Sequence, residues 1–344
     1  MKAVIVEKST TTPVYHGAKV VDLPKPTVDD NQALLEVNAV SFNHRDLWIR
    51  KGQYPGIIFG SVYGADGVGR IVDIKGSSKH RLGDRVVVMP SVGWVKDPRG
   101  PEDAYYILGG GQVQGIFSEY FVAQQEDLFK APEHLTDAEA AALPLAGLTA
   151  YRAVFTKGQV SKGQNVLITG IGGGVALIAL SFCVAAGANV YVTSSDDAKI
   201  VKAVRLGAKG GVNYKDEKWG ANLQRLIGGD PIDVVIDGAG GDGVKTFTHI
   251  LRLGGIIVSY GMTVKPKVDY SMAAVLKNIE IRGSTMGSRQ EFQQMLDFVS
   301  AHRVKPVVSE IWQGLESAEH AFETMKNGAQ FGKLVLSLKT SSKL

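Results

Sequence analysis

The sequence predicts an α/β protein in which a doubly wound parallel sheet is inserted into a β-rich domain. The first half reads as short strands punctuated by glycine and proline, whereas strands and helices alternate from Asn165 onward. After Gly287 the pattern changes again, to amphipathic helices and a last strand. The 344 residues suit two domains. We therefore expect one domain over residues 1–146 and 287–344, and an inserted one over 147–286.

The individual elements follow from the spacing of apolar residues and from Gly and Pro breaks. Strands are expected in the β-rich part at Lys2–Val6, Ala33–Val40, Val68–Asp73 and Arg85–Met89, with an irregular surface lobe over Trp94–Val113. In the inserted part they are expected at Val166–Thr169, Val190–Thr193, Gly211–Asn213, Asp233–Asp237, Gly255–Tyr260 and Ile279–Gly283. The expected helices are Ala146–Phe155, Val175–Ala186, Asp197–Leu206, Trp219–Ile227, Gly243–Leu251, Gln290–His302 and Ala318–Asn327, before a final strand Lys333–Leu338.

Composition narrows the classes of protein. Hydrophobic residues make up 44% and charged residues 21%, and the formal net charge is only +4 with no basic run, so we expect no nucleic-acid binding. No stretch reaches the apolar length of a membrane span, so we expect no membrane association either. The single cysteine, Cys183, excludes an internal disulfide framework and a four-cysteine zinc site, and we expect it to be a core residue.

The last three residues, Ser342-Lys343-Leu344, match the signal read by the peroxisomal import receptor. We therefore expect a peroxisomal location, and otherwise a cytoplasmic one.

A glycine-rich segment lies between a predicted strand and a predicted helix. It runs from Thr169 to Ala176 and contains Gly170, Gly172, Gly173, Gly174 and Val175. Glycines there let the backbone turn tightly and approach a pyrophosphate, which the helix N-terminus stabilises. No register gives the strict G-x-G-x-x-G pattern, but the strand before and the helix after favour a Rossmann dinucleotide site.

The end of the next strand indicates which dinucleotide is bound. An NAD site has Asp or Glu there, about 20 residues past the glycines, to bind the ribose 2′-hydroxyl. This chain has Ser194 and Ser195, with Lys199 one helical turn further on, and we expect Asp196 and Asp197 to cap the next helix. Hydroxyl and ammonium groups suit a 2′-phosphate, so we expect NADP(H).

Together with other stretches, these residues resemble the medium-chain dehydrogenase/reductase superfamily, in its zinc-free quinone oxidoreductase-like branch. The chain looks most like the fungal proteins called zinc-type alcohol dehydrogenase-like. The resemblance covers nearly the whole chain and implies a Rossmann domain inserted in a GroES-like catalytic domain. It is carried by Asn43–Asp46, Gly52–Pro55, Gly64–Gly69, Leu143–Ala150, Gly261–Thr263, Gly283–Ser288 and Phe331–Val335.

Metal ligands are missing from the positions that the resemblance marks. Zinc alcohol dehydrogenases have a cysteine near Asn43 and a His-Glu pair near Ala65 and Asp66, and this chain has neither. We therefore expect no metal site, with His44 near Asp46 as the one faint alternative. Without a metal as Lewis acid, a conjugated carbonyl or a quinone is an easier hydride acceptor than a simple ketone.

The resemblance also implies roles for individual residues. Tyr54 is the candidate proton donor or enolate stabiliser, Asn43 is expected to face nicotinamide and substrate, and Asp46 to order the same wall. Simple loop packing of Tyr54 is the alternative. By position, further cofactor contacts are expected at Thr149, Tyr214, Gly261, Met262 and Met286, and at Lys333 on the phosphates.

The function expected from these features is NADPH-dependent reduction of an enone, enal, enoyl thioester or quinone. Two alternatives stay open: a ketone or aldehyde reductase, and a non-catalytic NADPH-binding protein. The resemblance further implies a homodimer formed through the edge of the cofactor sheet, where Ile279–Gly283 is the candidate strand.

Overall fold

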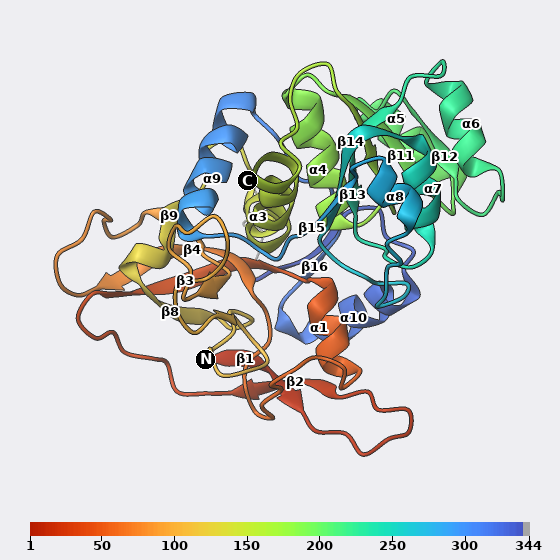
Figure 1. The fold of residues 1–344 in the computed structure, drawn as a ribbon. Helices are drawn as coiled ribbons and strands as arrows, with labels where there is room; N and C mark the ends of the chain where they lie inside the picture. Colours follow the sequence, from red (N-terminus) through yellow and green to blue (C-terminus); the bar gives the residue numbers. More distant parts are fainter. Residues whose placement is uncertain (340–344) are drawn as a thin grey trace. The chain divides into compact units, whose positions relative to one another are not determined.

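The computed structural model describes residues 1–339, so the predicted import signal Ser342-Lys343-Leu344 lies outside the described residues. Within residues 1–339, no helix combines the length and the apolar character that crossing a membrane requires. The chain divides into two compact units (Figure 1). Unit 1 comprises Met1–Ala146 and Ser288–Leu344, and unit 2 comprises Gly147–Gly287. Gly287 thus falls in the inserted unit, one residue beyond the predicted boundary.

Unit 1 is built on a seven-stranded sheet with the path β16-β17-β3-β4-β5-β9, in which β8 also pairs with β3. Neighbouring strands are antiparallel except β16 and β17. The strands are β3 (Gln32–Ser41), β4 (Asp66–Ile74), β5 (Arg85–Val88), β8 (Tyr120–Gln124), β9 (Leu128–Lys130), β16 (Val308–Gln313) and β17 (Lys333–Ser337). Two hairpins complete its strands, β1 (Lys2–Glu7) with β2 (Gly17–Asp22) and β6 (Ser91–Val92) with β7 (Tyr106–Ile107).

The helices of unit 1 are α1 (His44–Arg50), α2 (Asp137–Ala141), α9 (Arg289–His302) and α10 (Ala318–Asn327), with short 3₁₀ turns at Gln125–Asp127 and Leu315–Ser317. One apolar core joins the sheet to α1 and α10, and Phe42, Phe117 and Phe322 lie at its centre. This core holds α1, whose two ends carry predicted site residues, in a fixed position.

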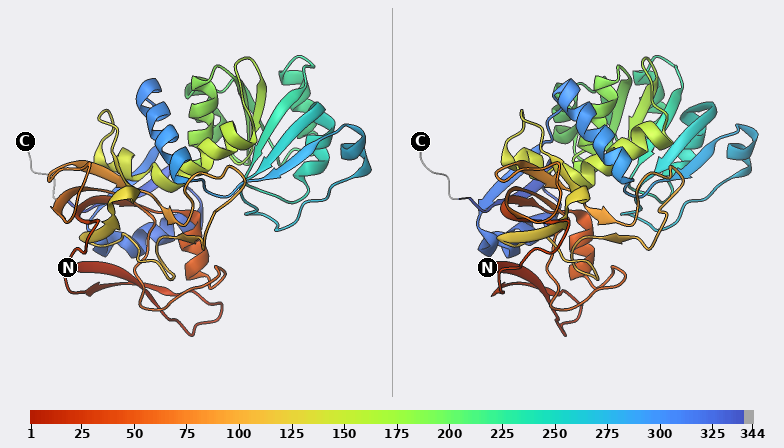
Figure 2. Two further views of the ribbon diagram at one scale, coloured as in Figure 1. Left: turned by 60° about the vertical axis from the view of Figure 1, so that its left-hand side comes forward. Right: turned by 90° about the vertical axis from the view of Figure 1, so that its left-hand side faces the viewer.

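Unit 2 contains a parallel six-stranded sheet with the order β12-β11-β10-β13-β14-β15, which is the strand order of a Rossmann fold. Helices cover both of its faces (Figure 2). The strands are β10 (Asn165–Ile168), β11 (Asn189–Ser194), β12 (Gly210–Asn213), β13 (Ile232–Asp237), β14 (Leu251–Ser259) and β15 (Glu280–Gly283). The helices are α4 (Gly174–Ala185), α5 (Asp197–Arg205), α6 (Trp219–Leu226), α7 (Gly243–Ile250) and α8 (Met272–Leu276).

The predicted fold class is confirmed, and the differences have physical causes. Strands β2, β6, β7, β8, β9 and β16 and the helices α1, α2 and α8 were not predicted. β2 and β16 are only partly buried and lack clear alternation, and the other elements are short. The predicted helix from Ala146 is α3 (Pro144–Tyr151), which begins with a proline at its first position and continues as a π-helix over Arg152–Lys157. The predicted surface lobe is wrong at its end, since residues 108–110 are buried against unit 1.

Candidate active site

The helix α1 brings two of the predicted catalytic residues together in unit 1. Asn43 is its N-cap with an extended backbone, and its main-chain N–H donates to Oδ2 of Asp46 at 2.8 Å. An Asn followed three residues later by Asp is a local capping pattern, so the sequence itself folds these two residues against each other. Asp46 is completely buried, and its burial raises its pKa while the guanidinium of Arg45 opposes the shift.

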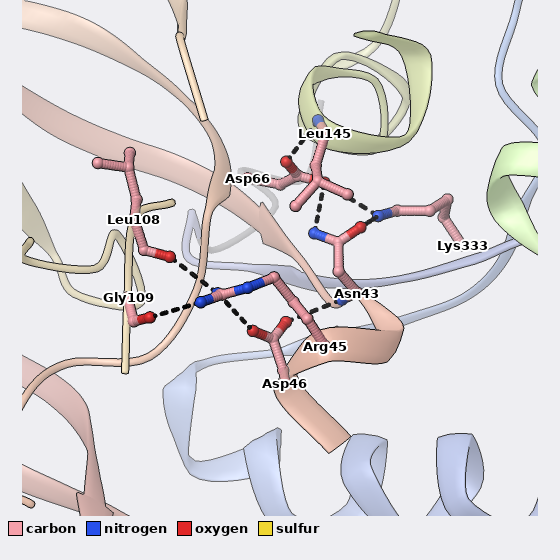
Figure 3. Close-up of polar contacts among 8 residues, drawn as sticks. All are labelled: Asn43, Arg45, Asp46, Asp66, Leu108, Gly109, Leu145 and Lys333. Atoms are coloured by element: carbon pink, nitrogen blue, oxygen red, sulfur yellow. Dashed lines mark hydrogen bonds and ion pairs between the residues drawn. The ribbon is translucent and has the colours of Figure 1, made fainter. Parts of the chain in front are cut away.

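The amide of Asn43 belongs to a buried charged cluster (Figure 3). The ammonium of Lys333 donates to Oδ1 of Asn43 at 2.6 Å and to Oδ2 of Asp66 at 2.9 Å. Nδ2 of Asn43 donates to the same Asp66 oxygen at 2.9 Å. An ammonium only donates and a carboxylate only accepts, so the amide has a single orientation, and one N–H of Nδ2 is left for a ligand.

Asp66 is the centre of this cluster. Its Oδ1 accepts from the main-chain N–H of Leu145 at 2.8 Å, in the first turn of α3, and its side chain is completely buried. Asp66 therefore joins three segments that are far apart in the sequence: β4, the start of β17 and the start of α3. Asp66 lies in the Gly64–Gly69 motif, but no role was predicted for it, because no local pattern shows that a carboxylate will pair with distant residues.

Lys333 is placed differently from its prediction as a phosphate contact. Its side chain is only 4% exposed, and its ammonium is engaged by Asp66 and Asn43 within unit 1. A buried carboxylate is the strongest available partner for a buried ammonium. We therefore assign Lys333 to the Asn43–Asp66 cluster.

Tyr54 lies just beyond the other end of α1. The helix ends at Arg50 with Lys51 as its C-cap, and Gly52, with φ +66°, turns the chain out of the helix. The ring of Tyr54 packs against the core of unit 1, and Cζ of Arg45 lies 4.6 Å from the centroid of that ring. The predicted trio Asn43, Asp46 and Tyr54 is thus brought together by one short helix, with Arg45 between them.

A zinc site does not fit these residues. Protein zinc sites need three or four converging Cys, His or carboxylate ligands. Residues 1–339 contain no group of three or more His, Cys, Asp or Glu side chains that could hold a metal ion. Cys183 is fully buried in α4 of unit 2, which confirms its prediction as a core residue. In unit 1, the ammonium of Lys333 beside Asp66 would repel a cation.

The glycine-rich segment of unit 2 has the geometry of a pyrophosphate cradle. It joins β10 to α4, whose N-cap is Gly173. Gly170 has φ +62° and Gly172 has φ +126°, conformations that side-chain-bearing residues rarely adopt. A Cβ at Gly170 would meet nothing within 4 Å, so the space above the loop is open for a ligand. Gly174 and Val175 form the first turn of α4, where free N–H groups favour an anion.

A buried polar pair crosses the switch point of the sheet, where strand order reverses between β10 and β13. The hydroxyl of Thr169 donates to Oδ1 of Asp237 at 2.6 Å, and Oδ2 of Asp237 accepts from the N–H of Gly240 at 2.9 Å. Burial raises the pKa of Asp237, which is 1% exposed. Ligands of doubly wound folds bind at this switch point, so the pair shapes the loops of the cofactor crevice. Both residues were missed, because each reads as an ordinary strand end.

The end of β11 holds the predicted 2′-phosphate residues. Ser194 is 3% exposed and its hydroxyl accepts from the N–H of Asp196, so it is less accessible than a phosphate contact requires, and Ser195 is the better candidate. Asp196 is the N-cap of α5, as predicted, and accepts from Ala198 at 2.9 Å. The main-chain N–H of Tyr214 donates to the carbonyl of Ser194 at 3.0 Å, which places Tyr214 on the same side.

The remaining predicted cofactor residues also follow the carboxyl ends of strands or lie beside them. Gly261 and Met262 come directly after β14. The hydroxyl of Thr149 in α3 donates to the sulfur of Met286 at 3.7 Å, so two predicted nicotinamide contacts touch each other. Met286 has φ +43°, a rare backbone conformation for a residue with a side chain and one that concentrates at functional sites.

A Rossmann unit inserted in a β-rich unit with a buried polar cluster defines a two-domain oxidoreductase class. Two family models match the chain: "Alcohol dehydrogenase GroES-like domain" over residues 29–133 and "Zinc-binding dehydrogenase" over residues 174–301. The zinc-type alcohol dehydrogenase-like protein YogA of Leptosphaeria maculans is 42% identical over 94% of this chain and 96% of its own length. A zinc-type alcohol dehydrogenase-like protein of Schizosaccharomyces pombe is 32% identical over 90% of this chain and 92% of its own. The chain belongs to the medium-chain dehydrogenase/reductase superfamily and is an oxidoreductase of that type.

Solved structures agree with this assignment. An NAD-dependent alcohol dehydrogenase has a TM-score of 0.88 and 30% identity, covering 98% of this chain and 100% of that one. A crotonyl-CoA carboxylase/reductase has a TM-score of 0.88 and 26% identity, covering 100% of this chain and 90% of that one. These likenesses support a nicotinamide cofactor for this chain.

Proposed function

We propose that this chain is an NADPH-dependent reductase that acts on a conjugated acceptor, an α,β-unsaturated carbonyl compound or a quinone, without a metal. The observation that carries the proposal is the donor set of the cluster in unit 1. It offers an amide N–H and a buried ammonium–carboxylate pair, while the ring of Tyr54 lies against Arg45 of α1, and no group of zinc ligands occurs among residues 1–339. Such groups suit an acceptor whose charge spreads onto an oxygen that hydrogen bonds can stabilise.

The cofactor choice rests on the loop after β11. NADPH would supply the hydride. Ser195 and the first turn of α5 would face the 2′-phosphate, while Asp196 already caps that helix and Asp197 accepts from the amide of Asn213. A capping carboxylate is engaged with backbone N–H groups and is a poor partner for a ribose hydroxyl. The glycine loop and the N-terminus of α4 suit the pyrophosphate of either cofactor.

The residues of unit 1 have separate roles in this proposal. The free amide N–H of Asn43 stabilises the enolate oxygen, and the orientation of that amide is set by Lys333 and Asp66. Tyr54 donates the proton that completes the reduction. Asp46 holds the main chain of Asn43 at the start of α1 and touches no substrate.

The relatives support different substrate classes. The crotonyl-CoA carboxylase/reductase is named for an unsaturated thioester, which is a conjugated acceptor. The NAD-dependent alcohol dehydrogenase is named for the alternative, oxidation or reduction at a simple carbonyl centre. The missing zinc donors favour the first, because a simple ketone lacks any other Lewis acid here.

A substrate panel tests the proposal. We expect purified protein to oxidise NADPH with enones, enoyl thioesters or quinones, with higher kcat/KM than with the matching saturated ketones, and with NADPH preferred over NADH. Tyr54→Phe should lower kcat with little change in NADPH affinity. A preference for saturated ketones would favour the alcohol dehydrogenase reading, and tight NADPH binding without turnover would favour a non-catalytic binding protein.

We also propose a homodimer that forms through the edge of the unit 2 sheet. β15 is its edge strand, and exposed apolar side chains lie near it: Leu253 (69% exposed), Met272 (67%) and Leu276 (72%). Pairing two edges would bury both the free backbone groups and these side chains. Sedimentation at micromolar concentration should give a dimer, and Leu276→Glu should shift it toward monomer; a monomeric wild type would contradict the proposal.

A further inference from the structure

We propose that Arg45 is a positioning residue that fixes the ring of Tyr54 for proton transfer. This role rests on the proposed function and deepens it. Arg45 is the second residue of α1, whose N-cap is Asn43, and Tyr54 lies just beyond the other end of this helix. Nothing in the sequence motif assigns it a task, and its contacts give it one.

Three hydrogen bonds hold the guanidinium of Arg45 rigidly. Nη1 donates to the carbonyl of Leu108 at 2.9 Å and to Oδ1 of Asp46 at 3.3 Å, and Nη2 donates to the carbonyl of Gly109 at 2.9 Å (Figure 3). The side chain is 9% exposed. Because the guanidinium is planar, partners at three points fix both its position and the direction of its face.

The two carbonyls that hold Arg45 are themselves fixed by glycines. Gly109 has φ +81° and Gly110 has φ +76°. A Cβ at Gly109 would lie 2.5 Å from the backbone N of Gly64, and one at Gly110 would lie 2.5 Å from the side chain of Ile49. The loop therefore packs directly on α1 and on the turn at Gly64, and its carbonyls have little freedom.

The ring of Tyr54 lies on this platform. Cζ of Arg45 is 4.6 Å from the ring centroid, within the range of a cation–π contact. The ring also packs against the apolar core of unit 1. A phenol confined on its faces can move its hydroxyl only by small displacements, which is what a proton donor needs.

Packing alone does not require an arginine at this position. Nε of Arg45 is buried and has no hydrogen-bond partner among residues 1–339. An unsatisfied buried donor lowers stability, so apolar packing alone would not select an arginine here. The guanidinium satisfies Asp46 and two main-chain carbonyls, and these bonds turn its face to the ring of Tyr54.

A double-mutant cycle tests this role. We expect Arg45→Met to lower kcat about tenfold with an unchanged dissociation constant for NADPH, because a displaced donor slows the chemical step. In the Tyr54→Phe background the same substitution should have no further effect. Arg45→Lys, which keeps the charge but loses the planar fork, should give an intermediate kcat and also serves if the methionine variant does not fold.

Arg99→Met, at an exposed arginine of the same unit, is the matched control and should behave as wild type. Losses that multiply in the double variant, or an equal fall in NADPH affinity, would overturn the proposal.

A spectroscopic measurement keeps this proposal separate from the proposed function. In protein labelled with 3-fluorotyrosine, the ¹⁹F resonance of Tyr54 is the one that disappears in Tyr54→Phe. Arg45→Met should shift and broaden that resonance, because the ring loses its platform. If Tyr54→Phe keeps full turnover, the proton-donor role fails, yet the resonance still decides whether Arg45 holds the ring. An unchanged resonance in Arg45→Met would overturn the inference.

Discussion

The two units of this protein build their sites from different parts of the chain. In unit 2 the candidate cofactor loop is formed by the backbone: glycines with positive φ, the N-terminus of α4 and the ends of parallel strands. In unit 1 the cluster is made of charged side chains, with Asp66 and Lys333 buried and paired. Backbone recognition leaves a pattern of glycines at short spacing, whereas a side-chain cluster draws on residues hundreds of positions apart. We therefore expect substitutions in the unit 1 cluster to lower stability, and substitutions in the unit 2 loop to weaken ligand binding.

The largest expected effect is on the stability of the unit 1 cluster. Asp66→Asn leaves the ammonium of Lys333 buried without a carboxylate, and we expect a loss of about 3–5 kcal/mol in the free energy of unfolding. Urea unfolding followed by circular dichroism measures it. The double variant Asp66→Asn/Lys333→Met should recover part of the loss, because no lone charge stays buried. A single-variant loss below about 1 kcal/mol would mean that the pair is not buried as a unit.

The matching change in unit 2 should affect ligand binding more than folding. Gly172→Ala places a side chain at φ +126°, which strains the loop by about 1–3 kcal/mol. We expect the dissociation constant of NADPH, measured by fluorescence titration, to rise about tenfold or more. The control is Gly163→Ala, at φ +87° in an open turn, which should cost stability but leave NADPH affinity unchanged. Equal affinity in Gly172→Ala would remove this loop from the cofactor site.

The pH dependence of stability offers a test of the buried pair in unit 2. Burial raises the pKa of Asp237 above its ordinary value of 3.8, so the folded state holds this proton more tightly than the unfolded chain does. Its contribution to stability is present below pH 3.8 and is lost as pH rises through the folded pKa. The free energy of unfolding of Asp237→Asn, relative to wild type, should therefore increase with pH across that window. A flat or falling difference in paired urea titrations would contradict this.

The smallest effect is expected for an exposed ion pair. Arg99 and Asp97 lie 3.2 Å apart in unit 1, but the arginine side chain is 90% exposed. Solvent screens such a pair, so Arg99→Met should change the free energy of unfolding by less than about 0.5 kcal/mol. A loss comparable to that of Asp66→Asn would erase the distinction between buried and surface charge drawn here.

The sequence by itself determined the fold class and the glycine-rich turn of the candidate cofactor site. The alternation of strands and helices after Asn165 predicted the parallel sheet, since its period and its breaks are local properties of the chain. The glycines at 170–174 predicted the turn before α4 for the same reason. The capping pair Asn43 and Asp46 was also local, because three residues separate them.

Tertiary structure alone decided the rest of the candidate site. Lys333 was predicted to contact the cofactor phosphates, and only the pairing of β17 with β3 brings it to Asn43, 290 positions away. The platform under Tyr54 depends on the loop at Leu108 and Gly109 packing on α1, which no local pattern records. Edge strands such as β16 were missed because pairing with a distant strand, here β17, defines them, and no period-two pattern does. Local backbone geometry is determined by neighbouring residues in the sequence. The partner of a buried charge depends on which distant segment the folded core places beside it.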